Sequence, residues 1–431
     1  MNYSASIAYL YNLQKHGIKL GLETMAALMA RLDWPHARFR TLHIAGTNGK
    51  GSTAAMAAAV LHAAGYRVGL YTSPHLVDFR ERIRVDGEMI SEEWVSQLTQ
   101  QIRTACRHDL SPTFFECTTA MAFQHFADAS VEVAVVEVGL GGRFDATNVI
   151  RPVACAITTI ALDHQQYLGP TLSSIAAEKA GIIKPKIPVV VGRMDAEAEG
   201  TIERIAMERQ APIHRLKRDF RTVGLSTSRF EYQGVRRRQE GLTCLLAGRH
   251  QLDNAACALA LLEMGATEGI LISEEAIRQG LRSVKWEGRL EIVERHPTVV
   301  LDGAHNPAAA AALADSLSEM MQAKRQGRLI MVLGMMRDKN HQGFITPFRH
   351  LMGEVVLTQA DLPRAATVRE LRAALQDRLP SLHEAPVPAD ALALAKRLAG
   401  PDDVICVTGS LMLVGDVTAL YRGCGLSPIR G

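Results

Sequence analysis

Short β-branched runs alternate with helical stretches through the first two thirds of the chain. The strand-like runs are residues 67–71, 131–138, 153–160 and 188–191. Residues 133–136 and 154–157 are apolar on both faces of the expected strand. Strands of this kind are typical of a parallel sheet that is covered by helices on both sides. The pattern therefore predicts an α/β fold with a parallel central sheet.

The alternation begins again after an amphipathic helix that we expect between residues 270 and 287. The later strand-like runs are residues 298–301, 329–333, 355–357 and 404–407, and the helical segments include 307–322 and 368–378. We therefore predict two domains, residues 1–287 and residues 288–431, of which the second is a smaller Rossmann-like α/β domain. A chain of 431 residues is too long for one ordinary core.

A glycine-rich turn joins the apolar run that ends at Ala45 to a helical stretch that starts near Thr53. Its residues are Gly46, Thr47, Asn48, Gly49, Lys50, Gly51 and Ser52. Glycines let successive backbone N–H groups surround phosphate oxygens, a helix N-terminus adds partial positive charge, and Lys50 adds a full charge. The segment predicts a P-loop that binds a nucleoside triphosphate. A plain turn that needs glycines for steric reasons is the alternative.

Composition narrows the class of protein. Lys and Arg number 48 against 45 for Asp and Glu, so the net charge of +3 gives no broad basic surface for nucleic acid. The seven cysteines include no Cys-x-x-Cys pair, and no apolar run is long enough to cross a bilayer. Residues 1–20 lack the apolar core of a secretory signal. We expect a cytoplasmic protein with reduced thiols that binds neither nucleic acid nor membranes.

Polar residues follow two of the predicted central strands. Glu137 lies at the end of the run 131–138, and His164 follows the run 153–160. Ligands in open α/β sheets bind at the carboxyl ends of the strands, so these side chains can meet in one crevice. A carboxylate at a strand end commonly holds the magnesium of a bound triphosphate. The alternatives are a Glu137 paired with Arg143 and a His164 that is an ordinary core or surface histidine.

Further candidates lie in the loops and helices around these strands. Lys179 belongs to a helix of small and apolar residues, and physical reasoning alone makes it a lysine paired with a neighbouring carboxylate. Ser73 follows a strand and is either a ligand or a turn residue. The amide of Asn254 is a candidate for contact with a nucleobase. In the second domain, residues 302–307 join a strand to a helix and suggest a ligand-binding edge.

These motifs, in their order along the chain, resemble those of the folylpolyglutamate synthase and dihydrofolate synthase family, relatives of the Mur ligases. The motifs are residues 46–52, 73–76, 137–148, 162–164, 178–182 and 302–307. The resemblance covers nearly the whole chain. It implies an ATP-dependent amide ligase that transfers the γ-phosphoryl group of ATP to a carboxylate. The α-amine of L-glutamate then attacks the acyl phosphate, and phosphate leaves.

The resemblance also implies the metal and ATP sites. One Mg²⁺ would bind Ser73 and Glu137 together with ATP phosphates, and a second would bridge Glu137, His164 and a carbamylated Lys179. Carbamylation would turn that lysine into an anionic oxygen ligand, which reverses the physical interpretation given above. The implied catalytic residues are Lys50, Glu137, His164 and Lys179. The implied ATP contacts are the glycine-rich turn 46–52, Asn254, Arg289 and Asp302.

The remaining implied contacts concern the two other substrates. His305 and Ser410 match positions near the incoming glutamate. The pterin side would be formed by Gly17, Ile18, Lys19, Leu20, Thr113, Phe115, Arg143, Asp145 and Ala146. The implied substrates are ATP, L-glutamate, dihydropteroate and reduced folates, and we expect the enzyme to act as a monomer.

The pattern of Thr113 with Phe115 and of Asp145 with Ala146 favours an enzyme with both activities. A folylpolyglutamate synthase without dihydrofolate synthase activity is the first alternative. A peptidoglycan-precursor ligase is a second, but it would need an N-terminal uridine-nucleotide domain for which the residues before the turn leave no room. A catalytically idle nucleotide-binding regulator is a third, although such a protein is expected to have lost residues such as Lys50 and Glu137.

Overall fold

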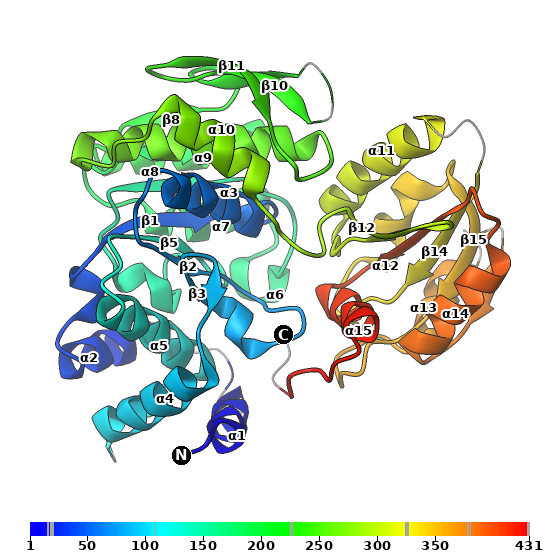
Figure 1. Ribbon diagram of the computed structural model, residues 1–431, viewed down its shortest axis with the longest axis horizontal. Coiled ribbons are helices and arrows are strands. Elements are labelled where there is room, and N and C mark those ends of the chain that lie inside the picture. The colour runs from blue at the N-terminus through cyan, green and yellow to red at the C-terminus, as the bar shows by residue number, and fades with distance from the viewer. Residues whose placement is uncertain are drawn as a thin grey trace. The chain divides into compact units, whose positions relative to one another are not determined.

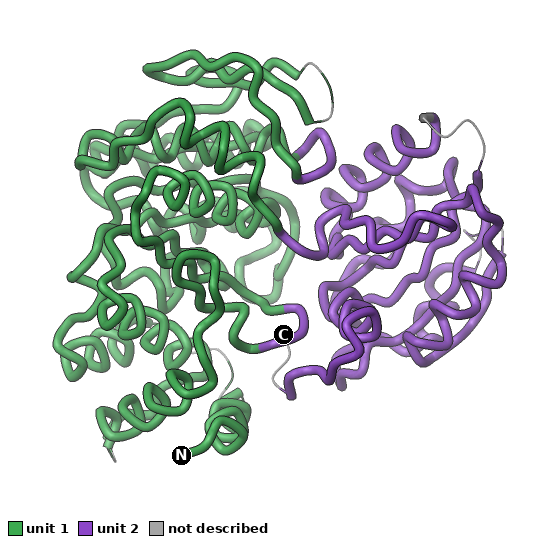
Figure 2. The backbone as a smooth tube through the Cα atoms, viewed as in Figure 1, with its two compact units in different colours: residues 1–75, 79–245, 251–285 green, residues 76–78, 246–250, 286–431 purple. Residues whose placement is uncertain are grey.

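The computed structural model describes residues 1–14, 17, 21–107, 109–224, 226, 228–323, 327–376, 379 and 381–428. The chain forms two compact units, which are coloured separately in Figure 2. The larger unit contains residues 1–75, 79–245 and 251–285, and the smaller contains 76–78, 246–250 and 286–431. The sequence places the division after residue 287, close to the main break between residues 285 and 286.

An eight-stranded sheet forms the centre of the larger unit (Figure 1). Its strand order is β4 (Glu88–Met89), β3 (Ile83–Val85), β2 (Val68–Tyr71), β5 (Val133–Glu137), β1 (Arg40–Ala45), β6 (Ala154–Ile157), β7 (Val189–Val191) and β8 (Ile213–Arg215). The strands from β2 to β8 run parallel, whereas β3 and β4 pair antiparallel at one edge. The predicted parallel α/β sheet is confirmed.

Helices and a small antiparallel sheet accompany these strands along the chain. The helices are α1 (Tyr3–Leu13), α2 (Glu23–Arg31), α3 (Lys50–Ala63), α4 (Glu92–Cys106), α5 (Phe114–Asp128), α6 (Gln165–Leu168), α7 (Leu172–Lys179), α8 (Ala196–Glu208), α9 (His250–Gly265) and α10 (Glu274–Ser283). The small sheet has the order β11 (Arg238–Thr243), β10 (Arg229–Gln233) and β9 (Arg221–Gly224). Short 3₁₀ helices are η2 (Pro35–Ala37), η3 (Phe79–Arg82), η4 (Ala146–Val149), η5 (Ala180–Ile182) and η6 (Ala266–Glu268).

The helix α10 is shorter than the segment 270–287 predicted from its amphipathic pattern. The Ser273 side chain accepts a hydrogen bond from the backbone of Ala276 and so starts the helix, and Val284, with ψ of 130°, has already left the helical conformation. α10 packs closely on α3, because a Cβ at Gly280 would lie only 2.5 Å from the Cα of Val60. The amphipathic pattern therefore located the helix, whereas capping and backbone geometry set its ends.

A six-stranded sheet forms the smaller unit. Its order is β12 (Glu291–Arg295), β13 (Thr298–Leu301), β17 (Val404–Thr408), β14 (Leu329–Leu333), β15 (Met352–Leu357) and β16 (Leu382–Glu384). β12 is antiparallel to β13, and the other pairs are parallel. The helices are α11 (Pro307–Ala323), α12 (His341–Ile345), α13 (Val368–Leu375), α14 (Pro388–Leu398) and α15 (Leu411–Arg422), with the 3₁₀ helix η7 (Thr346–Phe348).

The strand β14 explains why this second sheet is covered on both faces. Leu329, Met331 and Leu333 belong to one buried apolar cluster, whereas Ile330 and Val332 belong to another. Successive residues of a strand point to opposite faces, so both faces of the sheet are buried. The continuous apolar run of the sequence thus produces an α/β unit of the predicted type.

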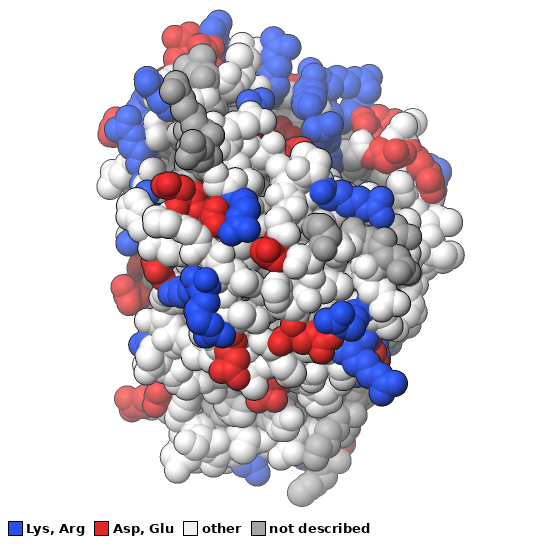
Figure 3. Space-filling model, turned by 90° about the vertical axis from the view of Figure 1, so that its right-hand side faces the viewer, with Lys and Arg blue, Asp and Glu red and all other residues white. Residues whose placement is uncertain are grey.

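Two further findings bear on the expected class of protein. Among the described residues, no helix is long and apolar enough to span a membrane. All seven cysteines are free thiols, and Cys424 is the exposed one among them. On the face of the molecule drawn in Figure 3, Lys and Arg side chains are interspersed with Asp and Glu, as the small net charge suggests.

Candidate active site

The glycine-rich turn lies between β1 and α3 and leaves the start of the helix open. Gly49 precedes the helix in the left-handed region, with φ of 86°, and no side chain caps it. Thr53 is the first residue after the turn whose N–H bonds back along the helix, to the carbonyl of Gly49 at 2.9 Å. The N–H groups of residues 50–52 are therefore not used by the helix. Such a terminus fits an anionic phosphate.

Close packing explains why residues 46 and 49 of the turn are glycines. A Cβ at Gly46 would lie 2.0 Å from Thr158 Oγ1, and a Cβ at Gly49 would lie 2.4 Å from Asn254 Oδ1. Both residues also have positive φ, which other residues rarely adopt. The packing places Asn254, from α9, directly against the turn. The glycines are therefore required sterically, as the alternative of a plain turn proposed, because they serve both packing and backbone conformation.

Two threonines beyond the end of β6 hold the turn in place. Thr158 Oγ1 donates a hydrogen bond to the carbonyl of Asn48 at 2.7 Å, and Thr159 Oγ1 accepts one from the N–H of Asn48 at 3.0 Å. The carbonyl of Thr159 accepts the N–H of Thr47 at 2.7 Å. Both threonines belong to the run 153–160 that was predicted as a strand, so this role was not predicted. The only local signal was a pair of hydroxyls after an apolar run.

Glu137 lies next to two other predicted residues, Lys50 and Ser73. It is the last residue of β5 and only 4% exposed. Its Oε1 lies 4.0 Å from Lys50 Nζ, and its Oε2 accepts the N–H of Ser73 at 3.2 Å. Lys50 Nζ also donates to the carbonyls of Gly46 and Thr47, at 3.1 and 3.3 Å. A buried carboxylate, a lysine and a serine from three separate segments thus meet at one edge of the sheet.

Arg82 is a buried cation that the sequence analysis did not single out. It is 2% exposed, its Nε donates to His75 Nδ1 at 2.8 Å, and its guanidinium lies 5.3 Å from the centre of the Phe114 ring. Burial lowers the pKa of Arg82, while the charges of neighbouring groups, Glu137 among them, act in the opposite direction. A guanidinium stays protonated in proteins. Arg82 therefore adds positive charge on the side of Glu137.

Lys179, at the end of α7, is buried to 5% exposure. Burial is the main cause that lowers its pKa to about 7, the charge of Lys50 adds to the effect, and Asp163 and Asp145 oppose it. The structure thus places this amine near another lysine and near acids from two other loops. A lysine in this state is much closer to its neutral, nucleophilic form than an exposed lysine.

His164 and Asp163 lie in the loop after β6. The backbone N–H of His164 donates to Asp163 Oδ1 at 2.9 Å, and His164 Nε2 lies 4.0 Å from Asp163 Oδ2. The His164 side chain is 37% exposed, whereas Asp163 is buried. Asp163 was not among the predicted site residues, although it directly precedes the predicted histidine. Its position suggests that it orients His164.

The donor set decides which cations these residues could hold. No group of three or more His, Cys, Asp or Glu side chains suited to a metal ion occurs among the residues that the structure describes. Glu137 and Ser73 fit one hard cation if phosphate oxygens complete its shell. A second cation beside Glu137 and His164 fits only if Lys179 supplies oxygen, because an ammonium group cannot ligate. The neutral amine needed for that change is accessible at a pKa of about 7.

Five of the residues predicted on the pterin side lie in the loop that follows Glu137 or at the start of α5 beside it, namely Thr113, Phe115, Arg143, Asp145 and Ala146. A Cβ at Gly139 would lie 2.3 Å from the Phe115 ring, so this ring rests directly on the loop, 6.0 Å from the ring of Tyr71. Thr113 forms a capping box with Glu116 at the start of α5. The start of α5 and the end of β5 are therefore locked together.

The rest of the loop packs on the segment that carries Lys179. The N–H of Arg143 donates to the carbonyl of Glu178 at 2.8 Å, and Arg143 Nε lies 3.7 Å from Glu178 Oε1. A Cβ at Gly181 would lie 2.4 Å from the Cα of Arg143, so the two segments touch. Ala146 is buried and Gly17 is exposed with φ of 63°. Ile18, Lys19 and Leu20 lie outside the described residues.

The predicted residues of the smaller unit form a group of their own, where β13 and β17 end side by side. Asp302 Oδ2 accepts the N–H of Leu290 at 2.8 Å, and Gly303 leaves so little space that a Cβ would lie 2.5 Å from an Arg289 guanidinium nitrogen. His305 Nδ1 lies 2.9 Å from the carbonyl of Gly303. Ser410 caps α15 through its hydroxyl. Arg289, Asp302, His305 and Ser410 are thus neighbours within this unit.

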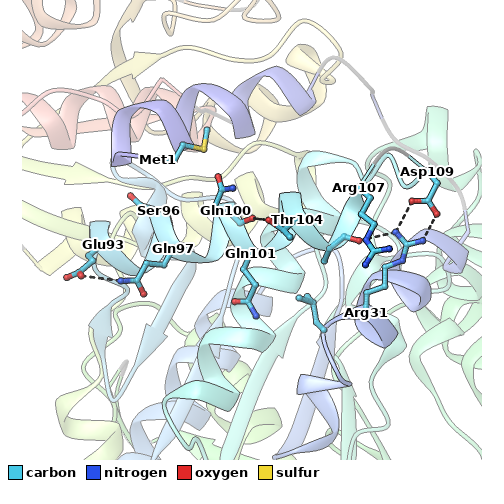
Figure 4. A pocket seen from close by; sticks show the side chains of 12 residues that line it. Met1, Arg31, Glu93, Ser96, Gln97, Gln100, Gln101, Thr104, Arg107 and Asp109 are labelled. Carbon is cyan, nitrogen blue, oxygen red and sulfur yellow. Dashed lines mark hydrogen bonds and ion pairs between the residues drawn. The ribbon is translucent and has the colours of Figure 1, made fainter.

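A cavity of about 1300 Å³ lies elsewhere in the larger unit (Figure 4). Its lining comes mainly from α4, together with Met1, Arg31, Leu32, Arg107 and Asp109. Arg31 forms an ion pair with Asp109 at 2.5 Å across one end of it. None of the described lining residues is among the predicted site residues. The pocket therefore does not replace the site at the strand ends.

Two protein-family models match this chain. The Mur ligase middle domain matches residues 44–262, and the Mur ligase glutamate ligase domain matches residues 288–411. A protein of Bacillus subtilis named dihydrofolate synthase/folylpolyglutamate synthase is 37% identical over 426 residues, which cover 96% of this chain and 98% of the relative.

Solved structures give the same result over the whole length. E. coli FolC in complex with DHPP and ADP is 34% identical, with a TM-score of 0.89 and coverage of 98% of both chains. A bifunctional folylpolyglutamate synthase/dihydrofolate synthase with Mn, AMPPNP and L-glutamate bound is 35% identical, with a TM-score of 0.88 and coverage of 98% of both chains. The architecture of both units therefore matches that of these proteins.

Proposed function

Because this chain belongs to the dihydrofolate synthase/folylpolyglutamate synthase family of Mur ligases, we propose that it is an ATP-dependent ligase that joins L-glutamate to dihydropteroate and to reduced folates. The first reaction gives dihydrofolate, and the second gives polyglutamates. The single observation that carries this proposal is the meeting of Glu137, Lys50 and Ser73 at the end of the central strands.

The chemistry proceeds in two steps. The carboxylate of the acceptor attacks the γ-phosphorus of ATP, which gives an acyl phosphate and ADP. The α-amine of L-glutamate then attacks the acyl carbon, the C–O bond to phosphate breaks, and the amide forms with loss of a proton. Lys50 and the N–H groups of residues 50–52 would bind phosphate oxygens as charge shifts during transfer, a role that the uncapped start of α3 supports. Water must be kept from the acyl phosphate, which otherwise hydrolyses.

Members of the family bind nucleotides and divalent metal ions. We propose Mg²⁺ as the metal of this chain, with one ion held by Ser73 and Glu137 and a second by Glu137, His164 and carbamylated Lys179. The ions would neutralise charge on the transferred phosphoryl group. The geometry supports the first set, since the backbone N–H of Ser73 donates to Glu137 Oε2 and so holds the two residues side by side. The burial of Lys179 supports its modification.

The remaining roles are divided between the two parts of the chain. We propose that residues 1–287 bind ATP and the folate, with Asn254 beside the phosphates and with Phe115 and Asp145 on the pterin side. Residues 288–431 would bind glutamate through His305 and Ser410 and contribute Arg289 and Asp302 to ATP. We further propose that the enzyme acts as a monomer in the cytoplasm.

Supplying both acceptor substrates to the purified protein tests the function. With Mg²⁺, ATP and labelled L-glutamate, we expect dihydropteroate to give labelled dihydrofolate and tetrahydrofolate to give labelled polyglutamates. Chromatography of the products separates the two outcomes. A product from tetrahydrofolate alone would leave a folylpolyglutamate synthase without dihydrofolate synthase activity. ATP binding without either product would instead support the idle regulator.

Carbamylation of Lys179 makes a separate prediction. Lys179→Ala is expected to lower turnover by about 100-fold, because loss of a metal-ligating oxygen weakens the second metal site. Acetate or propionate should restore part of the activity by supplying a carboxylate. Wild-type protein should lose activity when bicarbonate is removed and regain it when bicarbonate is added back. The recovery should be faster above about pH 7 than below it, because the neutral amine reacts with CO₂ and the pKa of Lys179 is about 7.

Lys184 is the matched control for this experiment. It is another lysine in the same unit whose pKa burial lowers, to about 8, and its Nζ donates to the carbonyl of Asn148 at 2.8 Å. Any loss of activity in Lys184→Ala should not respond to carboxylates, because its role is structural. A Lys179→Ala enzyme with normal turnover, or an amine without added density in a liganded crystal, would contradict carbamylation.

A further inference from the structure

A buried hydrogen-bond chain links the strand before the glycine-rich turn to the loop after Glu137. It consists of His43 on β1, Thr147 in η4 and Asp145, which directly precedes η4. Thr147 Oγ1 donates to Asp145 Oδ1 at 2.5 Å, and His43 Nε2 lies 2.9 Å from Thr147 Oγ1. His43 and Thr147 are fully buried, and Asp145 is 6% exposed. This hydrogen-bond chain therefore connects β1 to the loop after Glu137 in the buried interior, without contact with water.

The hydrogen-bonding capacity of the three groups sets the direction of the chain. A carboxylate only accepts and a threonine hydroxyl has one proton, so Thr147 donates to Asp145 and accepts from His43 Nε2–H. His43 is neutral, because burial and the nearby charge of Lys184 lower its pKa to about 3. Within the part of the chain that the structure describes, His43 Nδ1 has no hydrogen-bond partner. His43 is therefore the neutral tautomer that carries its proton on Nε2.

Asp145 connects this chain to both ends of the loop. Its Oδ1 also accepts the N–H of Thr147 at 3.0 Å, and its Oδ2 accepts the N–H of Leu140 at 2.8 Å. Leu140 follows Gly139, against which the Phe115 ring packs. The orientation of the Asp145 carboxylate thus determines the path of the loop 139–147 and the support of the Phe115 ring.

Stability alone does not account for the imidazole at position 43. His43 lies between Leu42 and Ile44 in a strand that is buried almost throughout. A buried polar ring with an unpartnered nitrogen is costly, and an apolar side chain of similar size would avoid that cost. Polar groups that break the local pattern in this way are expected at functional sites.

We propose that His43 and Thr147 are positioning residues for the acceptor substrate, which act through Asp145 to hold the loop 139–147 in the form that receives the flat heterobicyclic ring of that substrate. The inference rests on the proposed function and deepens it, since neither His43 nor Thr147 is among the residues expected on the pterin side. Neither residue belongs to the glycine-rich turn 46–52. Their loss therefore affects the binding of the acceptor and leaves the binding of ATP unchanged.

Thr147→Val is the first test, because valine has the shape of threonine without the hydroxyl. The variant leaves His43 Nε2–H without its acceptor and removes the hydroxyl donor of Asp145 Oδ1, which keeps the backbone N–H of Thr147. We expect the KM for dihydropteroate to rise roughly tenfold, as for one hydrogen bond lost in a buried site, with the KM for ATP unchanged. Thr147→Ser keeps the hydroxyl and should restore the KM for dihydropteroate.

His43→Leu is the second test, and it separates function from stability. The variant should unfold at the same denaturant concentration as wild type or a higher one, while its KM for dihydropteroate rises. His43→Gln can place a donor near the position of Nε2 and should retain the wild-type KM. In ¹⁵N-labelled wild-type protein, the His43 signals should identify the neutral ring protonated on Nε2.

The outcomes separate this inference from the proposed function. Wild-type protein without activity on dihydropteroate or tetrahydrofolate would overturn the function itself. Active wild-type protein with Thr147→Val and His43→Leu at normal KM for dihydropteroate would overturn only the positioning role. An equal rise in the KM for ATP, a loss of stability that accounts for the lost activity, or a ring protonated on Nδ1 would also overturn it.

Discussion

Lys50→Ala is expected to lower kcat by about 100-fold or more while the protein stays folded. Lys50 is the first residue of α3, and its amine lies at the carbonyls of Gly46 and Thr47 and 4.0 Å from Glu137. In a closed site, one such charge on a transferring group stabilises the transition state by about 3 kcal/mol. Alanine is a strong helix former, so the helix itself should persist. Single-turnover and steady-state kinetics measure the effect.

Two companion variants identify the cause of the loss. Lys50→Met keeps most of the aliphatic stem without the charge and should be as impaired as Lys50→Ala. Lys186→Ala removes an exposed lysine of the same unit and should leave kcat unchanged. A near-normal rate in both Lys50 variants would mean that the glycine-rich turn does not bind the phosphates.

Glu137→Gln should abolish most of the metal-dependent activity. The amide preserves the shape of the side chain but removes the charge that binds a hard cation. Because metal ions stabilise phosphoryl transfer by several kcal/mol, we expect kcat to fall by roughly 100-fold or more and the metal concentration for half-maximal rate to rise. Titration of activity with Mg²⁺ and with Mn²⁺ gives both values. Far-UV circular dichroism and thermal unfolding should show a folded protein.

The opposite end of the same strand provides the control. Glu132 directly precedes β5, is exposed, and accepts the N–H of Arg67 at 2.8 Å. Glu132→Gln makes the same chemical change away from the site and should have no effect on metal dependence. A Glu137→Gln enzyme with the wild-type rate and metal requirement would contradict the metal site and favour a protein that binds nucleotide without catalysis.

The local pattern of the sequence was sufficient for the sheets and for the turn. Apolar runs such as 133–136 and 329–333 are buried on both faces wherever they occur in a covered sheet, so they identify central strands without tertiary information. The glycine-rich turn is equally local, since Gly46 and Gly49 adopt positive φ next to a helix start. The carboxyl ends of parallel strands lie at one edge, which explains why Glu137 at the end of β5 lies 4.0 Å from Lys50 at the turn.

The burial, neighbours and pKa of the site residues depend on contacts between distant segments. They therefore could not be derived from the sequence. Lys179 was interpreted as an ordinary paired lysine, yet burial and the charge of Lys50 lower its pKa to about 7. Asp163 was part of a motif but not a candidate site residue, and only the fold places it near Lys179. Helix ends likewise depended on capping geometry, as α3 begins at Lys50 rather than near Thr53.

The chain by itself determined the α/β architecture, the glycine-rich turn before a helix, the acid at the end of β5 and the histidine in the loop after β6, because each follows from residues that are close together in sequence. Only the tertiary structure decided which distant residues hydrogen-bond to these parts and how deeply their side chains are buried. Asn48 and Thr159 are separated by 111 positions, and His43 and Thr147 by 104. Hydrogen bonds of this kind leave no periodic pattern in the sequence, and burial, which sets both their strength and the pKa of Lys179, is a property of the folded molecule.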